Sequence, residues 1–590
     1  MPLGEMRPPQ SAAGVGIPPL PETGLMAWLP GVWVLRHYRR AWLADDVVAG
    51  LVLSSLLVPA GMGYAVASGL PAITGLYATI LPLLAYAVFG PSRIMVLGPD
   101  SGLVALVAAV VVGAPNADPG RAIALGAMLA VLTGLLCIVA GAARAGFLTD
   151  LLSKPVRVGY MNGIALTVLA TQLPKLFGFS VTGHGFKDGV VGFVQGLWAG
   201  KVQPIALSIG VACLVVIFVL RALWPKVPGI LVAVVLATLA VTIFHLETKV
   251  RVVGTVPRGI PTPSLPAVSF SDLGPLLVAS VGIALVSFAD TSVISRTFAA
   301  RHGYRVDPNR ELIGLGLANL AGGFFQGFPI SSSSSRTPVA ESAGSHTQVT
   351  GVVGALVIVA LLVVAPALMQ NLPTAALAAV VIAAAVRLFD FHSMRVFHFV
   401  RRSDLLLSLI AFLAVTLLGV IPGIGVAVGV SILDFVRRAW RPHDAVLGRA
   451  TGVKGYHDLK RYPDARQVPG LLLFRWDAPL FFANAEQFRE RIIELVDDAR
   501  VPVRWVVVAA EPITDVDTTA AEMIQELDIE LETRGVDLAF AELKDPVKDR
   551  LQRYGLKKRI GVDHFFPTVG VAVRSFRDLF RVEFTDWEEE

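Results

Sequence analysis

A run of serines followed by an arginine is the first feature with chemical potential. The segment GFPISSSSSRT places Ser334, Ser335 and Arg336 directly before a short apolar stretch. A helix that begins there presents free N–H groups and a partial positive charge, and the arginine adds a full charge. These residues predict an anion-binding site. The alternative interpretation is that the serines only cap the helix, while Arg336 neutralises Glu341 or Asp290.

A second short apolar stretch begins with LGPDS, where Pro99 suits a first helical turn and Asp100 and Ser101 follow. We expect the two helix starts to face each other and to form one pocket for the anion. Asp100 would repel an anion there, so capping its own helix is the alternative role for this carboxylate. Tyr64, in the first apolar span, is expected to line the pocket, with ordinary helix packing as the alternative.

Asp290 lies in VSFADTSVIS and has no basic neighbour along the chain before Arg296. An ionised side chain at mid-bilayer costs about 2.5 to 3.5 kcal/mol, so this carboxylate needs a reason to be there. Exchange of a proton or binding of a cation would couple transport to a gradient. A permanent ion pair with Arg336 is the alternative.

The whole chain has the composition of a membrane protein with a soluble tail. It has 590 residues, of which 54% are hydrophobic and 16% charged, and its mean hydropathy is +0.66. Residues 1–440 carry 28 basic and 17 acidic side chains, whereas residues 441–590 carry 22 and 28. Both cysteines lie in apolar spans, and we find no spacing typical of a metal site, a cofactor site or a catalytic nucleophile. An enzyme is therefore not expected.

Residues 46–440 contain fourteen candidate membrane spans. They begin near Val47, Ile73, Asp100, Arg121, Val158, Pro204, Gly229, Leu276, Glu311, Ser335, Gly351, Thr374, Leu405 and Gly423. The third and the tenth are too short to cross alone, and they stand seven spans apart, which is typical of an inverted repeat. Lys and Arg number fourteen in the loops after even-numbered spans and seven after odd-numbered ones, which predicts that both chain ends face the cytoplasm.

The flanking segments have their own character. Residues 1–25 are rich in proline, and we expect them to be disordered. Residues 26–45 combine aromatic and basic side chains, which predicts a helix that lies along the membrane surface. Residues 244–274 contain four prolines and are expected to form an extended external loop.

The tail is expected to hold a linker over residues 441–465, an α/β module over 466–580 and an acidic end over 581–590. Strands are predicted at 471–476, 505–510 and 536–541, each followed by a helical stretch. Asp517, Thr518 and Thr519 come just before one of these helices. Capping is one interpretation and a phosphorylation switch the other.

Longer motifs resemble the sulfate permease (SulP) family of anion transporters. They are VPAGMGYAVASGLPAITGLYA over residues 58–78, LGPDS over 97–101 and RHGYRVDPNRELIGLGLANLAGGFFQGFPISSSSSRT over 301–337. In the tail, VPGLLLFRWDAPLFFANAEQF over 468–488 and DVDTTAAEMI over 515–524 resemble the STAS domain of that family.

The resemblance implies an α-helical polytopic membrane protein of fourteen spans, built as a seven-plus-seven inverted repeat with core and gate domains and followed by a soluble STAS domain. It further implies a homodimer that moves its substrate by an elevator mechanism, with the anion between the third and tenth spans. By position, Arg336, Ser335 and Tyr64 match residues that line the family's site, and Asp290 matches an acidic position tied to coupling. Ala60 departs from the Gln or Glu of many relatives. Ile294 replaces the hydroxyl expected in a sodium-coupled bicarbonate relative.

We therefore expect a secondary active transporter of small oxyanions in the cell membrane, with sulfate favoured, bicarbonate and dicarboxylates as alternatives, and a proton as the preferred co-ion. Sodium-coupled bicarbonate transport is the first rival. A nucleobase permease is another, against which Arg336 argues. A membrane-tethered scaffold that signals through its STAS domain is the rival outside transport.

Overall fold

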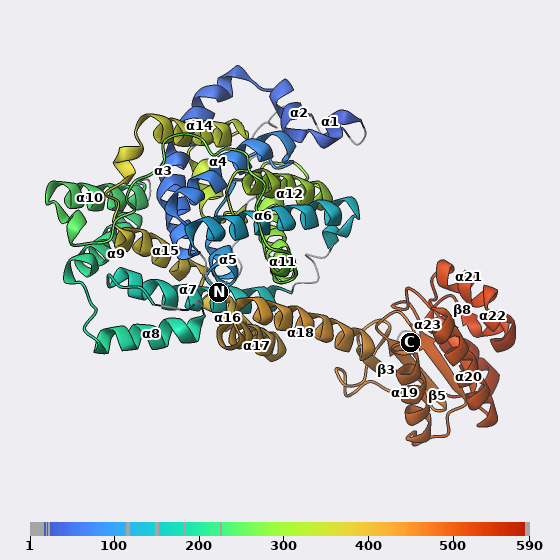
Figure 1. The fold of residues 1–590 in the computed structure, drawn as a ribbon. Helices are drawn as coiled ribbons and strands as arrows, with labels where there is room; N and C mark the ends of the chain where they lie inside the picture. Colours follow the sequence, from blue (N-terminus) through green and yellow to red (C-terminus); the bar gives the residue numbers. More distant parts are fainter. Residues whose placement is uncertain are drawn as a thin grey trace. The chain divides into compact units, whose positions relative to one another are not determined.

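The computed structural model describes residues 17–18, 20–21, 24–113, 118–147, 153–181, 183, 185–224 and 227–584 (Figure 1). The chain divides into two compact units, residues 1–431 and 432–590. Most of the proline-rich segment 1–25 and residues 585–590 of the acidic end lie outside the described residues.

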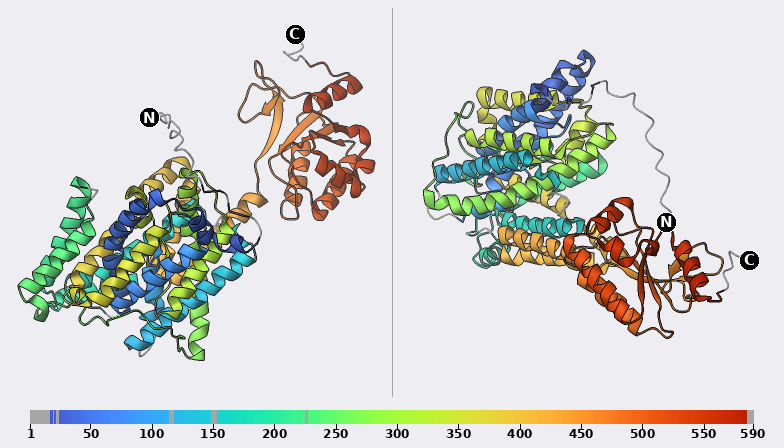
Figure 2. Two further views of the ribbon diagram at one scale, coloured as in Figure 1. Left: turned by 90° about the horizontal axis from the view of Figure 1, so that it is seen from above. Right: turned by 90° about the vertical axis from the view of Figure 1, so that its right-hand side faces the viewer.

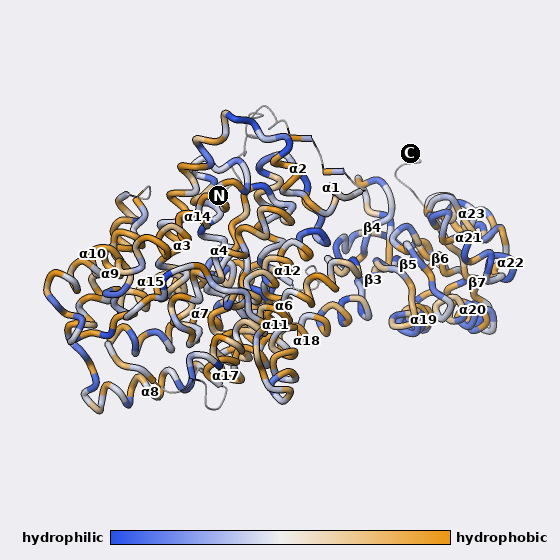
Figure 3. The backbone as a smooth tube through the Cα atoms, turned by 45° about the horizontal axis from the view of Figure 1, so that its top comes forward, coloured by the Kyte–Doolittle hydropathy of each residue, from blue (hydrophilic) through white to orange (hydrophobic). Residues whose placement is uncertain are grey.

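A helix begins close to each of the fourteen predicted span starts. These helices are α3 (Leu43–Ala67), α4 (Ala72–Phe89), α5 (Ser101–Val111), α6 (Pro119–Ala142), α7 (Lys154–Leu176), α9 (Pro204–Leu223), α10 (Gly229–Ile243), α11 (Phe270–Arg301), α12 (Pro308–Phe324), α13 (Arg336–Ser342), α14 (Val349–Val364), α15 (Thr374–Leu388), α17 (Arg402–Leu418) and α18 (Val420–Trp440). Apolar residues dominate them (Figure 3). Among the described residues, seven helical segments are long and apolar enough to cross a membrane alone, and α5 is among the shorter apolar ones.

Several segments differ from the prediction. Two helices, α8 (Phe186–Trp198) and α16 (Phe391–Val400), were not expected from the sequence. The predicted surface helix over 26–45 is instead two short helices, α1 (Leu25–Trp28) and α2 (Pro30–Arg36), and a 3-10 turn, η1 (Arg40–Trp42). Pro30 separates the first two, because a proline fits the first turn of a helix but not its interior.

The helices of the first unit pack into two groups, each of which contains helices from both halves of the chain. In the core group, α6 packs on α12 and α11, α4 on α12, and α3 on α14 and α13, and α5 packs on α6 and α11. Gly134 and Gly316 let α6 and α12 approach, since a Cβ on either would lie within 2.7 Å of the other's carbonyl oxygen. In the gate group, α7 packs on α15 and α17, and α9 packs on α10 and α15. Figure 2 shows segments from the two halves, blue to cyan and green to yellow, interleaved within this unit.

Two very short strands bring the starts of α5 and α13 together. β1 (Leu97–Gly98) pairs antiparallel with β2 (Ser331–Ser332), with Leu97 opposite Ser332 and Gly98 opposite Ser331. Each strand leads into its helix within a few residues. Backbone hydrogen bonds therefore hold the LGPDS and SSSSSR segments side by side inside the core group.

The second unit is a six-stranded sheet in the order β4-β3-β5-β6-β7-β8. Its strands are β3 (Asp444–Arg449), β4 (Tyr456–Asp458), β5 (Leu471–Trp476), β6 (Trp505–Ala509), β7 (Asp537–Ala541) and β8 (Phe565–Phe566). β5 to β8 run parallel, and β3 is antiparallel to both of its neighbours. The three strands predicted from sequence are confirmed.

The sheet carries helices on both faces. Helices α19 (Ala485–Asp497), α20 (Thr518–Thr533), α21 (Asp545–Arg553) and α22 (Leu556–Ile560) share one apolar core, and α23 (Val569–Phe580) forms a second core on the opposite face. The predicted linker over 441–465 was wrong, because β3 and β4 belong to the sheet. β3 has only six residues, and both of its ends are charged, so its sequence is too short a pattern to indicate a strand. Asp517 caps α20 by accepting from the Ala520 amide at 2.8 Å, so the capping interpretation is confirmed.

Candidate functional site

Arg336 joins the two facing helix starts. It is the first residue of α13 and only 4% exposed. Its Nη2 donates to the carbonyl oxygen of Pro99 at 2.6 Å and lies 3.9 Å from Asp100 Oδ1. Its Nη1 is buried and has no protein partner in the described part of the chain. A buried donor of this kind is expected to find an acceptor, and an anion would supply one.

The alternative pairing of Arg336 with Glu341 or Asp290 is not found. Glu341 Oε2 lies 3.3 Å from Arg301 Nη1, and its Oε1 lies 2.9 Å from His302 Nε2. Within the described residues, Asp290 makes no ion pair. The closest carboxylate to the Arg336 guanidinium is that of Asp100.

The serine run has divided roles. Ser333 Oγ accepts from the Arg336 amide at 3.3 Å and lies 3.2 Å from Ser335 Oγ. Ser333 thus caps α13, a role that sequence analysis did not assign to this particular serine. Ser335 makes no capping bond and lines a cavity, whereas Ser334 is exposed and is not among the residues that line it.

The start of α5 is built in a similar way. Asp100 accepts from the Gly102 amide at 3.0 Å, which confirms the capping interpretation for this residue. Ser101 opens the helix and is 6% exposed, and the phenol of Tyr64, 5% exposed, interacts with it. The third-span and tenth-span residues predicted from sequence therefore lie together, with Tyr64 beside them and Ser334 turned away.

Asp290 lies on α11, close to the start of α5. A Cβ on Gly102 would lie 3.4 Å from Asp100 Oδ2 and 3.6 Å from Asp290 Oδ2, so the two carboxylates approach one point. Hydroxyl groups of Ser287, Thr291 and Tyr160 are buried without a protein partner among the described residues, and Tyr160 interacts electrostatically with Asp290. A carboxylate cluster with free hydroxyls can take up a proton or a cation.

A cavity of about 780 Å³ opens next to Arg336. Its walls come from α3 and α13 of the core group and from α9, α10 and α15 of the gate group. Arg221, Arg336 and Arg387 line it, and no acidic residue is among its described lining residues. Three guanidinium groups against largely apolar walls create a positive potential that attracts anions.

Arg387 was missed as a site residue. Sequence analysis counted it only as a loop charge after the twelfth span, but it occupies the last turn of α15 and lines the cavity beside Ala383. The sequence signal that could have identified it is that Arg387 continues the helical pattern of the apolar span before it. Only the packing of α15 near α3 and α9 shows that this side chain reaches the cavity.

The fold and the site define a polytopic helical membrane transporter with a cationic pocket. Residues 43–411 match the model of the sulfate permease family, and residues 462–572 match that of the STAS domain. The chain belongs to the sulfate permease family of anion transporters. The family and fold class expected from the sequence are therefore confirmed.

Relatives span nearly the whole chain. A probable sulfate transporter of Mycobacterium tuberculosis is 42% identical over 95% of this chain and 100% of its own length. The chloroplastic sulfate transporter 4.1 of Arabidopsis thaliana is 30% identical over 92% and 81%. Solute carrier family 26 member 6 of Homo sapiens is 34% identical over 78% and 64%.

Solved structures share the fold. The murine solute carrier 26 family member A9 anion transporter, in its inward-facing state, has a TM-score of 0.84 over 97% of this chain and 96% of its own, at 24% identity. The transmembrane domain of the cyanobacterial bicarbonate transporter BicA has a TM-score of 0.57 over 67% and 98%, at 23% identity.

Proposed function

We propose that this protein is a secondary active transporter of small oxyanions and that sulfate is its main substrate. The observation that carries the proposal is the cavity lined by three arginines and no described acidic residue, at whose end a buried Arg336 nitrogen lacks a protein partner. A dianion gains about twice the Coulomb energy of a monoanion in such a field. The names of the bacterial and plant relatives agree with sulfate.

In this proposal the anion sits against Arg336 Nη1 and the Ser335 hydroxyl, beside the two helix starts. Pro99 and Asp100 hold the guanidinium in place rather than contacting the anion directly. Tyr64 closes the pocket on the side of α3. The bound anion therefore lies within the core group, while α9, α10 and α15 form the opposite wall of the cavity.

This arrangement supports an elevator movement. The anion's contacts with Arg336 and Ser335 belong to the core group, so the core can carry the site past the gate without breaking them. Arg221 and Arg387 belong to the gate helices and would not move with the anion. Their positive potential would attract anions to the entrance of the cavity.

A proton on Asp290 is the proposed coupling device. Asp290 lies in the same core group as Arg336 and near Asp100, so it would travel with the substrate. Protonation would remove one negative charge from the loaded core and lower its cost of crossing. Ile294, one turn later, lacks the hydroxyl that a sodium site would use, which favours a proton over sodium.

We infer a homodimer in the cell membrane with both chain ends in the cytoplasm. The excess of Lys and Arg in loops after even-numbered spans supports this orientation.

Uptake of labelled sulfate by proteoliposomes tests the substrate proposal. Arg336→Ala should abolish uptake because it removes the guanidinium that joins the two helix starts, whereas Arg305→Ala, which changes an exposed loop arginine, should not. Unlabelled sulfate should compete better than bicarbonate or fumarate. Undiminished uptake by Arg336→Ala, or stronger competition by bicarbonate, would contradict the proposal.

Coupling is tested in the same vesicles with imposed gradients. Asp290→Asn should still bind sulfate and exchange it across the membrane, but an inward proton gradient should no longer accelerate net uptake. A sodium gradient should have no effect on either protein. If Asp290→Asn keeps its response to the proton gradient, Asp290 is not the coupling residue.

A further inference from the structure

Two carboxylates are fully buried among the described residues, Asp46 and Glu311. Different kinds of donor hold them. Asp46 accepts from two backbone amides as well as from three hydroxyl groups. Glu311, in the first turn of α12, is held by hydroxyl groups alone: Tyr86 donates to its Oε1, Ser92 donates to its Oε2 at 2.9 Å, and Ser295 of α11 also hydrogen bonds to it. Neither carboxylate makes an ion pair with a described residue.

The kind of donor decides whether a buried carboxyl group can take up a proton. An amide can only donate, and the five donors around Asp46 fill the roughly four lone-pair sites of a carboxylate. A hydroxyl can donate or accept, so the hydroxyls around Glu311 can also receive a hydrogen bond from a protonated carboxyl. Burial without a counter-ion disfavours the ionised form. Glu311 is therefore suited to exchange a proton, and Asp46 is not.

The basic group beside Glu311 has other partners. The Arg93 guanidinium lies 4.6 Å from the Tyr304 ring centroid, and its Nη2 donates to the Ile17 carbonyl oxygen at 3.3 Å. The other charged side chains on α6, α11, α12 and the loop between α11 and α12 are all at least partly exposed, namely Arg121, Asp272, Asp290, Arg296, Arg301, His302, Arg305, Asp307 and Arg310. The uncharged titratable groups on these elements and on α4 are Tyr77, Tyr86, Cys137 and Tyr304.

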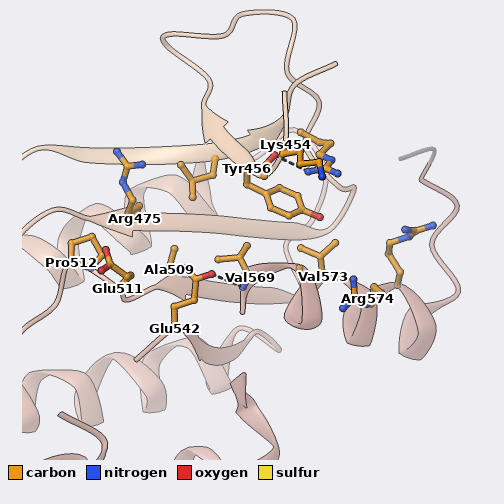
Figure 4. A pocket seen from close by; sticks show the side chains of 15 residues that line it. Lys454, Tyr456, Arg475, Ala509, Glu511, Pro512, Glu542, Val569, Val573 and Arg574 are labelled. Atoms are coloured by element: carbon orange, nitrogen blue, oxygen red, sulfur yellow. Dashed lines mark hydrogen bonds between the residues drawn. The ribbon is translucent and has the colours of Figure 1, made fainter. Parts of the chain in front are cut away.

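The STAS unit has no equivalent of Glu311 in its described part. Its cavity of about 480 Å³ lies between β3, β4 and the start of α23 (Figure 4). Lys454 and Arg574 of this cavity are exposed, and Glu542 Oε1 accepts from the Val569 amide at 3.3 Å. Both fully buried carboxylates belong to the membrane unit.

A row of hydroxyl groups on α11 leads from Glu311 towards Asp290. Ser287, Thr291 and Ser295 recur every four residues, so they share one face of the helix, and each is at most 2% exposed. Ser295 contacts Glu311, and Thr291 directly follows Asp290 in the chain. The hydroxyls of Ser287 and Thr291 have no protein partner in the described part of the chain. Free hydroxyls therefore lie between the two carboxyl groups.

We propose that Glu311 is a second proton-binding residue, which passes the coupling proton from Asp290 to the cytoplasm. The proton leaves the Asp290 carboxyl, moves along the hydroxyls of Thr291 and Ser295 and joins the Glu311 carboxylate, so Asp290 becomes ionised as Glu311 becomes neutral. Side chains four residues apart stand about 5 to 6 Å apart, a gap that one bridging water closes. Glu311 then gives the proton to water at the start of α12.

This direction of release follows from the proposed orientation, in which the loop before α12 faces the cytoplasm. The inference rests on the proposed coupling role of Asp290. It adds a separate residue and a route, so the two ideas can fail separately.

Infrared spectroscopy of the full-length protein in detergent tests whether Glu311 binds a proton. The carbonyl stretching band of a protonated carboxyl group should weaken as the pH is raised. Glu311→Gln should lack one such band that the parent shows. If this variant loses no pH-dependent carboxyl band, Glu311 does not exchange a proton and the proposal is overturned.

Transport assays in proteoliposomes separate a proton relay from structural support. Exchange of sulfate for sulfate at equal pH needs no net proton release, whereas net uptake driven by an inward proton gradient does. Glu311→Gln, Thr291→Val and Ser295→Ala should each slow net uptake at least about tenfold and leave exchange near the parent rate. Thr297→Val, which removes an exposed hydroxyl from the same helix, should match the parent in both assays.

The outcomes distinguish the relay from the coupling on which it rests. The relay alone is overturned if the parent responds to the proton gradient and the three variants respond equally well, or if they slow exchange as much as net uptake. A parent that ignores the proton gradient would overturn coupling through Asp290 and the relay with it.

Discussion

The guanidinium of Arg336 is held between two helix starts by contacts that leave little room. The backbone of Gly98 has a φ of 152°, and a Cβ at this position would lie 3.3 Å from Arg336 Nη1. Glycine is therefore required both for the backbone conformation and for the approach of the charge. The chemistry of the site depends on a residue that has no side chain.

Gly98→Ala should cut sulfate uptake at least about tenfold, because it shifts the guanidinium and strains the β1–β2 pairing. Initial rates in proteoliposomes measure the effect. Gly282→Ala, on α11 where the added methyl group meets open space, is the matched control and should transport normally. Equal activity of the two variants would mean that Arg336 tolerates displacement.

Arg387 is assigned a different role from Arg336, since it stands on the gate side of the cavity. Arg387→Gln should raise the KM for sulfate about three- to tenfold with little change in the maximal rate, because it weakens attraction and not the final site. The increase in KM relative to the parent should become smaller as ionic strength rises, because salt screens the attraction. Arg395→Gln, an exposed arginine outside the cavity, should match the parent, and a fall in maximal rate alone would contradict the entrance role.

At the scale of elements, one buried carboxylate ties the start of α3 to the segment between α13 and α14. Asp46 is fully buried. It accepts from the Tyr38 hydroxyl, the amides of His346 and Thr347, and the hydroxyls of Thr347 and Thr350, at 2.7 to 3.1 Å. This junction holds α3, which lines the substrate pocket, to the segment that follows α13 and to the start of α14.

Asp46→Ala should lower the unfolding free energy by about 3 kcal/mol or more, since several buried donors would lose their acceptor at once. The change is read as a lower Tm of the detergent-solubilised protein. Asp45→Ala is the control, because the neighbouring carboxylate is 56% exposed and has one longer contact, to His346 Nε2 at 3.3 Å. Similar Tm values for both variants would show that the Asp46 network is not a major support.

At the scale of the whole molecule, the predicted orientation can be tested with added cysteines, because Cys137 and Cys213 are both buried. Leu265→Cys lies in the long loop before α11 at an 82% exposed position, and Lys558→Cys lies on the STAS surface. A membrane-impermeant maleimide should label only Leu265→Cys in intact cells and both variants after permeabilisation. Labelling of Lys558→Cys from outside would reverse the orientation.

Much of this architecture follows from the sequence because a bilayer leaves few choices. Apolar runs must become helices there, since no water can satisfy the backbone, so the approximate positions of fourteen helices could be predicted from the apolar runs along the chain. The segments that were missed, α8, α16, β3 and β4, are short or amphipathic, and their places depend on neighbours that local pattern does not reveal.

The sequence by itself determined the family, the approximate helix positions, three of the STAS strands and the residues that carry charge into the apolar spans. Tertiary structure alone decided that Arg336 contacts Pro99 and Asp100 instead of Asp290 or Glu341, that Ser333 caps α13, and that Arg387 lines the cavity. The physical reason is that a span's own residues reveal only that it lies in an apolar environment. Which charged groups then meet depends on the register and crossing of helices far apart in the chain.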